Sequence, residues 1–506
     1  MDAKIDYWRR EDMLARLQSQ RDFDVVIIGA GATGLGVAVD AASRGLSVAV
    51  VDSQDFCAGT SSRSTKLIHG GLRYLANPLE WPRVREALFE RRLLLQNAPQ
   101  IVRAQTFIMP CYGYLKALAC GLGLGIYNLM SSGGKGLHGV AAIGRVNAMA
   151  QLPGIARKGL KAAFAYSDAQ FDDAGLGMAL LKTAVHYGAV VLNHAAVETL
   201  ETDGRRVTRV VAVDKMSGGT LELSGKVIMN CTGVWVDSLR RMADPDVSPL
   251  VRVARGTHIV VDRAYLPTGN AMAVPRTRRA RELFCIPWQG RLVIGTTQIE
   301  QGQAPFDPQP TADEIDFLID SANRFFTRRI RREDVKASFA GLRPLLNARA
   351  AGLRAGSTAN MTRTYAVVPE FGNMITVAGG NWTTYRAMAE LAMRTAQQLR
   401  LVPRRGCMTR SLPLIEHGRV ELESVQRELL KEGVPQTARA FESLQRIVGE
   451  AIITTGAATA HDVLFRRLRI GELDEALARE LTPVVEDMLQ RLQGRTVSQI
   501  RRLLRI

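Results

Sequence analysis

A β-branched run that leads directly into spaced glycines constrains the fold of this chain more than any other feature. The run Phe23–Gly29 reads FDVVIIG, the pattern of a strand buried on both faces of a sheet. Helix-compatible residues follow over Thr33–Arg44, and Gly45 suits the end of that helix. A second strand is predicted over Ser47–Asp52. The pattern therefore predicts a β-α-β unit that opens a doubly wound sheet.

The glycines between the first strand and the helix have the spacing GxGxxG, with Gly29, Gly31 and Gly34. The first permits a tight turn, the second lets the backbone approach a pyrophosphate, and the third lets helix and strand pack closely. The amino end of the helix then directs N–H groups toward the phosphates. Asp52 ends the second strand, where a carboxylate accepts hydrogen bonds from ribose hydroxyls. This arrangement predicts a dinucleotide site.

Two later segments favour FAD over NAD. The stretches NCTGVW (Asn230–Trp235) and AGGNWTTYR (Ala378–Arg386) each place glycines just beyond a predicted buried strand. In a doubly wound sheet such strand ends meet at one crevice. An extended FAD molecule would use several of these ends, so FAD fits the sequence better.

Composition limits the other classes of function. The chain has 506 residues, 46% hydrophobic and 23% charged, so two or three globular domains are expected. The formal charge of +17 favours an anionic partner or serves solubility, and both readings stay open. No basic stripe is interleaved with aromatics, even around the arginine clusters Arg276–Arg281 and Arg328–Arg332, so nucleic acid is not expected. Six dispersed cysteines without CxxC spacing predict reduced thiols and no metal site.

The segment Phe107–Met130 is the most membrane-like part of the chain. Pro110, Lys116 and four glycines interrupt it, so we do not expect it to span a bilayer. It could lie in the membrane interface or form a buried helix of the fold, and the sequence leaves both open. The charged amino terminus shows no signal peptide.

The patterns along the chain predict a division into domains. The predicted elements include helices over Leu79–Gln96, Ala174–Tyr187 and Ala312–Phe326, and a strand over Ala189–Val197. The expected parts are an N-terminal helix over 1–20, a discontinuous FAD-binding domain over 21–100, 150–244 and 346–403, a candidate membrane-interface segment over 101–149, a substrate-binding domain over 245–345, and a helical domain over 404–506.

Several longer stretches resemble one known family, the FAD-dependent glycerol-3-phosphate dehydrogenases. These are related to the glycine and D-amino-acid oxidases. The stretch GTSSRSTKLIHGGLRYL after the glycine fingerprint is the most specific, and the likeness covers nearly the whole chain. Further similar motifs are YSDAQFDDA (Tyr166–Ala174), RGTHIVV (Arg255–Val261), IPW with IGTT (Ile286–Thr297), GLRPLL (Gly341–Leu346), TTYRAMAE (Thr383–Glu390) and TAHDVLFRRLR (Thr459–Arg469).

The resemblance implies a mixed α/β fold: a Rossmann-like FAD-binding domain of the glutathione-reductase type, an inserted mixed β-sheet substrate domain, and a C-terminal helical cap. It implies oxidation of sn-glycerol 3-phosphate to dihydroxyacetone phosphate, with the hydride passing to flavin N5 and the electrons to membrane quinone. It also implies a peripheral protein bound to lipid at the inner face of the cytoplasmic membrane. A homodimer is left open.

The same resemblance assigns roles to individual residues. Arginine forks suit a phosphate dianion, and histidine suits a base near neutral pH, although a surface arginine or a structural histidine stays an alternative for each. The expected catalytic residues are His69, His258, Arg343 and Arg73, and the expected substrate-binding residues are Arg73, Tyr74, His258, Thr297 and Arg343. The expected FAD-binding residues are Gly29, Gly31, Gly34, Asp52, Thr60, Ser61, Ser62, Lys66, Leu67, His69, Gly70, Val197, Thr232, Gly233, Gly380, Asn381 and Thr383.

The chain departs from the family pattern near the expected chemistry. Asn381 stands where the family usually has a lysine, and Gln298 replaces an aspartate. Gly175, Cys231 and the stretch after GLRPLL also differ. Three readings remain open: an active glycerol-3-phosphate dehydrogenase, a flavoprotein acting on another hydroxy or amino acid, or a flavin-binding protein without catalysis. The net charge adds a fourth, a membrane or nucleic-acid adaptor, which does not explain the glycine fingerprint.

Overall fold

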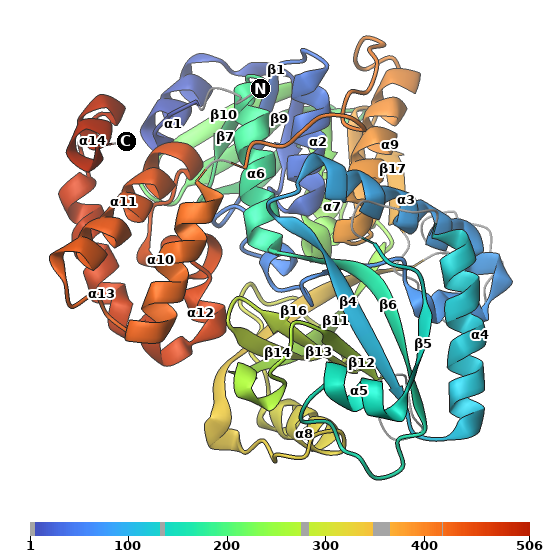
Figure 1. Ribbon diagram of the computed structural model, residues 1–506. Coiled ribbons are helices and arrows are strands. Elements are labelled where there is room, and N and C mark those ends of the chain that lie inside the picture. Colours follow the sequence, from blue (N-terminus) through green and yellow to red (C-terminus); the bar gives the residue numbers. More distant parts are fainter. Residues whose placement is uncertain (1–5, 132–136, 275–282, 348–364, 417, 506) are drawn as a thin grey trace.

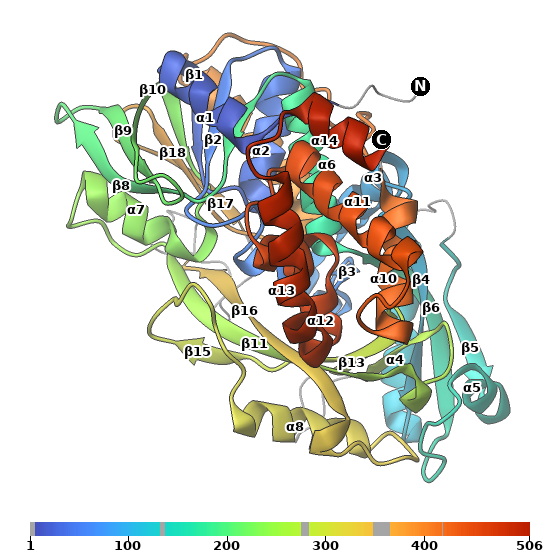
Figure 2. The same cartoon turned by 90° about the vertical axis from the view of Figure 1, so that its left-hand side faces the viewer.

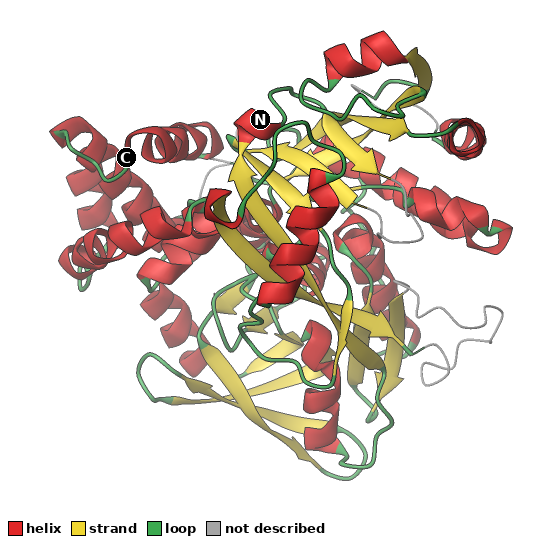
Figure 3. Cartoon of the chain, turned by 90° about the horizontal axis from the view of Figure 1, so that it is seen from below, coloured by secondary structure: helices red, strands yellow, loops and turns green. Residues whose placement is uncertain are grey.

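The molecule is built from two β-sheets and a helical C-terminal region, as a computed structural model shows (Figure 1). The structure describes residues 6–131, 137–274, 283–347, 365–416 and 418–505. Figure 3 shows the sheets as separate groups of strands, with the helical region to one side. The mixed α/β architecture expected from the sequence is confirmed.

The first sheet is largely parallel and carries the predicted β-α-β unit. Its order is β17-β18-β10-β1-β2-β7, and only β17 runs antiparallel to its neighbour within this path. Helix α2 follows β1, and α6 and α9 pack against α2. Strands β8 and β9 extend β10 as an antiparallel ribbon. The bounds are β1 Asp22–Ile28, α2 Ala32–Ser43, β2 Val48–Val51, α6 Asp173–His186, β7 Val190–Leu192, β8 Ala195–Thr202, β9 Val207–Asp214, β10 Thr220–Asn230, α7 Val236–Ala243, β17 Tyr365–Glu370, β18 Met374–Gly379 and α9 Tyr385–Gln398.

The second sheet lies below the first in Figure 1 and holds ten strands. Its order is β15-β11-β14-β13-β12-β4-β6-β3, with β16 paired to β11 and β5 paired to β6. The bounds are β3 Leu67–Ile68, α3 Trp81–Asn97, β4 Val102–Cys111, α4 Tyr114–Met130, β5 Ala141–Gly144, α5 Arg145–Gln151, β6 Ala162–Phe171, β11 Val251–Asp262, β12 Ala271–Val274, β13 Leu283–Trp288, β14 Arg291–Gly295, β15 Ile299–Gln301, α8 Ala312–Asn323 and β16 Val335–Leu346.

The second sheet draws on more of the chain than the expected range 245–345. Strand β4 lies in the stretch expected at the membrane interface, and β6 lies in the stretch assigned to the FAD-binding domain, yet the two pair along ten residues. Such pairing joins segments that lie far apart in the sequence, so the local sequence of neither strand indicates its partner. The strand expected over Ala189–Val197 is also divided, because His194 has a left-handed backbone (φ 52°) between β7 and β8.

The C-terminal region is helical, as the sequence indicates, and its first helix begins at Arg419. Figure 2 shows it packed along one side of both sheets. Its own apolar core includes Leu444, Leu464 and Leu481. The bounds are α10 Arg419–Glu432, α11 Ala438–Thr455, the π-helical turn Asp462–Arg467, α12 Ile470–Leu473, α13 Glu475–Leu492 and α14 Val497–Leu504, and the N-terminal helix is α1 Arg10–Ser19.

Two segments and one side chain singled out from the sequence lie wholly or mostly outside the described residues. The arginine cluster 276–281 and most of the divergent stretch after GLRPLL lie outside the described residues. The side chain of Arg73 is not described either, although its backbone belongs to a short 3₁₀ turn, Leu72–Ala76. Among the helices within the described ranges, none combines the length and apolar character needed to cross a membrane.

Candidate active site

A cavity of about 620 Å³ opens where four parallel strands end. Strands β1, β2, β10 and β18 run in the same direction, so their carboxyl ends form one edge of the first sheet. The second sheet closes the other side through β11 and β16. A site at this edge is the usual ligand position of a doubly wound fold, and the volume lies within the ordinary range for cofactor and substrate pockets.

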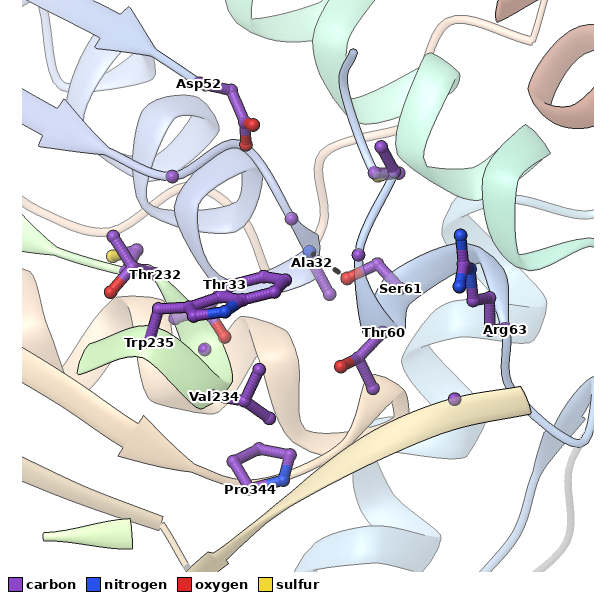
Figure 4. A pocket seen from close by; sticks show the side chains of 18 of the residues that line it. Ala32, Thr33, Asp52, Thr60, Ser61, Arg63, Thr232, Val234, Trp235 and Pro344 are labelled. Atoms are coloured by element: carbon purple, nitrogen blue, oxygen red, sulfur yellow. Dashed lines mark hydrogen bonds between the residues drawn. The ribbon is translucent and has the colours of Figure 1, made fainter. Parts of the chain in front are cut away.

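Most residues expected to contact FAD line this cavity. They are Gly29, Gly31, Asp52, Thr60, Ser61, Leu67, His69, Val197, Thr232, Gly233, Gly380, Asn381 and Thr383. Figure 4 shows part of this lining, with Asp52, Ser61, Trp235 and Pro344 contributed by four separate segments.

The glycine turn forms a cradle that side chains would fill. Gly29 has φ +96°, and a Cβ there would lie 2.7 Å from the carbonyl oxygen of Cys231. A Cβ on Gly31 would come within 2.9 Å of Ser61 Oγ. Gly34 does not line the cavity, but a Cβ on it would overlap the Gly29 carbonyl, so this glycine allows α2 to start close to β1. These glycines therefore fit a backbone that must approach a pyrophosphate closely.

Asp52 connects the glycine turn to the second strand. Its Oδ2 accepts a hydrogen bond from Ala30 N (2.6 Å), and its Oδ1 accepts one from Gln54 N (2.9 Å). Burial nevertheless raises the pKa of Asp52 to about 6, because water is largely removed from the carboxylate. A neighbouring donor, such as a ribose hydroxyl, would stabilise the ionised form.

The opposite end of the cavity holds one arginine and one histidine from adjacent strands. Arg343 on β16 donates from Nη1 to Thr297 O (3.1 Å) and from Nη2 to Thr296 Oγ1 (2.8 Å), which orients its guanidinium. His258 on β11 stacks on Phe339, with ring centroids 4.9 Å apart. Both Arg343 and His258 line the cavity. A guanidinium beside an imidazole suits an anionic substrate that must also lose a proton.

Two glycines make room for these side chains. A Cβ on Gly256 would lie 2.1 Å from Arg343 Nη1, and a Cβ on Gly295 would lie 2.2 Å from His258 Cδ2. Both belong to the motifs RGTHIVV and IGTT. The motifs therefore supply space for the polar groups as well as the groups themselves.

Other expected residues lie outside the cavity wall. Lys66 is fully buried and pairs with Asp173 and Glu472, both at 2.8 Å, so its charge is neutralised away from the cavity. Ser62 is also buried, and Gly70 donates its N–H to the hydroxyl of Tyr127. The Thr297 side chain donates to Glu314 Oε1 (2.7 Å). Tyr74 and Gln298 are likewise absent from the lining.

Asn381 is an exposed residue of the cavity wall. Its side-chain oxygen accepts the N–H of Thr384 (3.3 Å) and so caps the short turn Trp382–Thr384. Asn381 is therefore a neutral helix cap at a position where the resemblance led us to expect a cation.

The structure adds lining residues that we did not single out from the sequence. Arg63 and Thr65 stand within the GTSSRSTKL stretch, so their motif was a usable signal. Arg63 pairs with Asp307 (2.8 Å). Trp235 donates from Nε1 to Ala304 O (2.8 Å) and packs on Phe306 at 4.9 Å. The segment 304–307, which we call the strap, carries no comparable signal in the sequence.

Comparisons with known proteins agree with this geometry. The family model "FAD dependent oxidoreductase" matches residues 24–365. A mitochondrial glycerol-3-phosphate dehydrogenase of Arabidopsis thaliana is 37% identical over 419 residues, which are 80% of this chain and 66% of that protein. A probable mitochondrial glycerol-3-phosphate dehydrogenase of Caenorhabditis elegans is 32% identical over 535 residues, covering 97% of this chain and 73% of that protein.

A solved structure shares the fold. It is the glycerol-3-phosphate dehydrogenase of Bacillus halodurans complexed with FAD, with a TM-score of 0.75 and 24% identity, covering 98% of this chain and 95% of that one. The glycine cradle, the half-buried carboxylate of Asp52 and the row of strand ends along the cavity independently suit a bound dinucleotide. The chain belongs to the FAD-dependent oxidoreductases, within them to the glycerol-3-phosphate dehydrogenase family, and FAD is its cofactor.

Proposed function

We propose that this protein oxidises sn-glycerol 3-phosphate to dihydroxyacetone phosphate in the cavity between the two sheets. The observation that carries the proposal is the position of Arg343 and His258 on paired strands at one end of that cavity. Bound FAD supplies the acceptor for the hydride, at flavin N5. The curated relatives, which carry the name glycerol-3-phosphate dehydrogenase, support this choice of substrate.

The side chains have separate tasks in this proposal. Arg343 binds the phosphate, because a guanidinium held in one plane by Thr296 and Thr297 can offer a bidentate fork. His258 takes the hydroxyl proton as the general base. Its Nε2 lies 3.0 Å from Thr65 Oγ1, a contact that orients the ring. As the C–H hydride leaves and the O–H proton moves to His258, the alcohol carbon becomes a carbonyl. His69 lines the same cavity and is the alternative base.

Replacement of Arg343 tests the phosphate assignment. Arg343→Ala removes charge-assisted hydrogen bonds, so the KM for glycerol 3-phosphate should rise by roughly 10²-fold or more while FAD content stays at the wild-type level. Arg332→Ala is a matched control, because that arginine is exposed and pairs with Asp316 at 2.6 Å. An unchanged KM in the Arg343 variant would remove the phosphate assignment.

A substrate screen separates the proposed function from its alternatives. Under anaerobic conditions, glycerol 3-phosphate should bleach the flavin absorbance band of the purified protein. Bleaching only by another hydroxy acid or an amino acid would favour a divergent enzyme, for which neutral Asn381 is the specific support. Flavin that no small metabolite reduces would favour a non-catalytic protein.

We also propose that the electrons pass to membrane quinone and that α4 lies at the lipid surface of the inner face of the cytoplasmic membrane. Helix α4 contains no acidic residue, and Leu115 and Leu129 are each 86% exposed. Tyr114, Leu118 and Leu122 are exposed on the same helix. Lys161 lies 5.1 Å above the ring of Tyr114, which adds a cation beside the apolar groups. An apolar helix bordered by cations suits an anionic membrane surface.

Vesicle sedimentation tests this docking. The wild-type protein should sediment with anionic vesicles, and the double variant Leu118→Glu/Leu122→Glu should stay in the supernatant. Val420→Glu is the control, because Val420 is an exposed apolar residue on α10. Equal sedimentation of wild type and double variant would show that α4 does not dock. A separate assay tests the electron acceptor: enzyme that glycerol 3-phosphate has reduced should in turn reduce a soluble quinone.

A further inference from the structure

A buried cluster of charges lies behind the cavity wall, at the start of α6. Its centre is Asp173, which is fully buried. Asp173 Oδ2 accepts from Ser64 N (2.9 Å), Ser64 Oγ (2.7 Å) and Lys66 Nζ (2.8 Å). Asp173 Oδ1 accepts from Lys66 Nζ (2.9 Å) and from Arg469 Nη2 (2.8 Å). One carboxylate therefore holds two points of the segment 62–66 and one residue of the C-terminal region.

The carbonyl oxygen of Ser62 is the second anchor. It accepts from Lys66 Nζ (2.6 Å) and from Arg469 Nη2 (2.8 Å). Glu472 completes the cluster, because its Oε2 lies 2.8 Å from Lys66 Nζ and 2.7 Å from Arg469 Nη2. The four side chains Lys66, Asp173, Arg469 and Glu472 are all buried and balance to zero charge. Buried ion clusters of this kind are weak sources of stability, and a role in fixing local geometry has to be tested for each protein.

The cluster determines which side chains of the segment 62–66 point into the interior and which point into the cavity. Lys66 has φ +62°, a left-handed backbone that side chains rarely adopt. This turn directs Lys66 into the buried cluster, while its neighbour Thr65 lines the cavity. Interactions around Lys66 must therefore stabilise a backbone conformation that is unfavourable in isolation.

Two contacts connect this segment to His258. Thr65 Oγ1 lies 3.0 Å from His258 Nε2. Phe339 lies between the cluster and the imidazole, since Lys66 Nζ is 5.0 Å from its ring centroid and His258 stacks on it at 4.9 Å. A group that bonds one ring nitrogen of a histidine selects its tautomer and orientation.

We propose that Arg469 and Glu472 of the C-terminal helical region are positioning residues for His258, and that they act through Lys66, Thr65 and Phe339. Within the described part of the chain, no residue after Thr383 lines the cavity. The helical region nevertheless takes part in the reaction, because its two side chains set the segment that bonds the imidazole. This inference rests on the proposed function of His258 as the base.

Other charged groups also lie around His258. They are Arg343 on β16, the pair of Arg255 and Glu314 between β11 and α8, and His69 on the cavity wall. The variants below leave all four in place. A change in the titration of His258 can then be attributed to Thr65 and the cluster.

The experiment compares holoenzyme variants by anaerobic flavin reduction with glycerol 3-phosphate across a pH series. Thr65→Val should lower the reduction rate by about 10- to 100-fold and shift the apparent pKa of its pH profile, with KM and FAD content nearly unchanged. Thr65→Ser keeps the hydroxyl and should restore most of the rate. Glu472→Gln, which keeps the shape of the side chain, should shift the pH profile in the same direction by a smaller amount.

Leu481→Ala controls for loss of stability, because it truncates a fully buried side chain in the helical core without touching the cluster. It should lower the melting temperature and leave the pH profile at its wild-type position. A wild-type profile for Glu472→Gln would overturn the proposal whatever Thr65→Val does, and so would an equal shift in Leu481→Ala.

A second measurement does not depend on turnover. Ring-¹⁵N NMR of histidine-labelled protein, assigned with His258→Gln, should show that Thr65→Val and Glu472→Gln change the tautomer balance of His258 and that Leu481→Ala does not. If glycerol 3-phosphate fails to reduce wild-type flavin, the proposed function is refuted. The NMR comparison still decides the positioning contact, and unchanged His258 resonances in both variants would refute it.

Discussion

The carboxylate of Asp52 should make FAD affinity depend on pH in a defined way. Burial raises the pKa of Asp52 to about 6, so the protein without cofactor takes up a proton as the pH falls below 6. A ribose hydroxyl that donates to Asp52 prefers the ionised carboxylate. Binding below pH 6 must then release this proton, and each further pH unit should weaken FAD binding about tenfold. Above pH 7 the affinity should be nearly constant.

The assay is a titration of the apo-protein with FAD, followed by quenching of flavin fluorescence between pH 5 and pH 8. Circular dichroism verifies that the apo-protein is folded at each pH. Asp52→Asn is the matched variant: it keeps the shape of the side chain but has no proton to release, so its affinity should be weaker at pH 8 and nearly flat toward pH 5. Because the other ionisable groups of the cavity are the same in both proteins, the difference between the two curves isolates Asp52. Parallel curves would refute the assignment of Asp52 to the ribose.

Three further changes test other parts of the structure. Gly256→Ala would place a Cβ 2.1 Å from Arg343 Nη1, so it should raise the KM for glycerol 3-phosphate without loss of FAD. Gly269→Ala is the control and should have no effect, because a Cβ at Gly269 meets no atom within 4 Å. Asp307→Asn removes the partner of Arg63 and should speed FAD release in a stopped-flow competition assay, and an unchanged release rate would show that the strap does not retain the cofactor. Burial lowers the pKa of Lys182 from 10.5 to about 8. Between these two pH values the unfolded chain binds more protons than the folded chain, so the free energy of unfolding should rise with pH, by at most about 3 kcal/mol. Urea titrations should show a smaller rise for Lys182→Gln than for the wild type.

The sequence predicted the cofactor end of the fold better than the substrate end. The β1-α2-β2 unit was predictable because strand burial, glycine spacing and Asp52 all lie within thirty residues of one another, where local pattern and tertiary structure agree. The pairing of β4 with β6 was not, because neither strand carries information about its partner. Sequence similarity was needed to single out Arg343 and His258, since only the pairing of β11 with β16 places both on one wall of the cavity.

Lys66 illustrates the limit at the level of one residue. The stretch around it is rich in donors, and the family resemblance placed Lys66 among the FAD-binding residues. The direction of its side chain depends on a left-handed backbone and on Arg469 and Glu472, which lie roughly four hundred residues later. Thr65, one position earlier, faces the cavity instead. The resemblance identified the segment but not which of its side chains would line the cavity.

The bond from Arg469 to the Ser62 carbonyl also bears on how the protein is made. It joins residues 407 positions apart, so one partner is synthesised long after the other. During translation the segment that borders the flavin cavity therefore lacks this tether until Arg469 has been synthesised and has left the ribosome. We expect nascent chains truncated before Arg469 to retain little flavin.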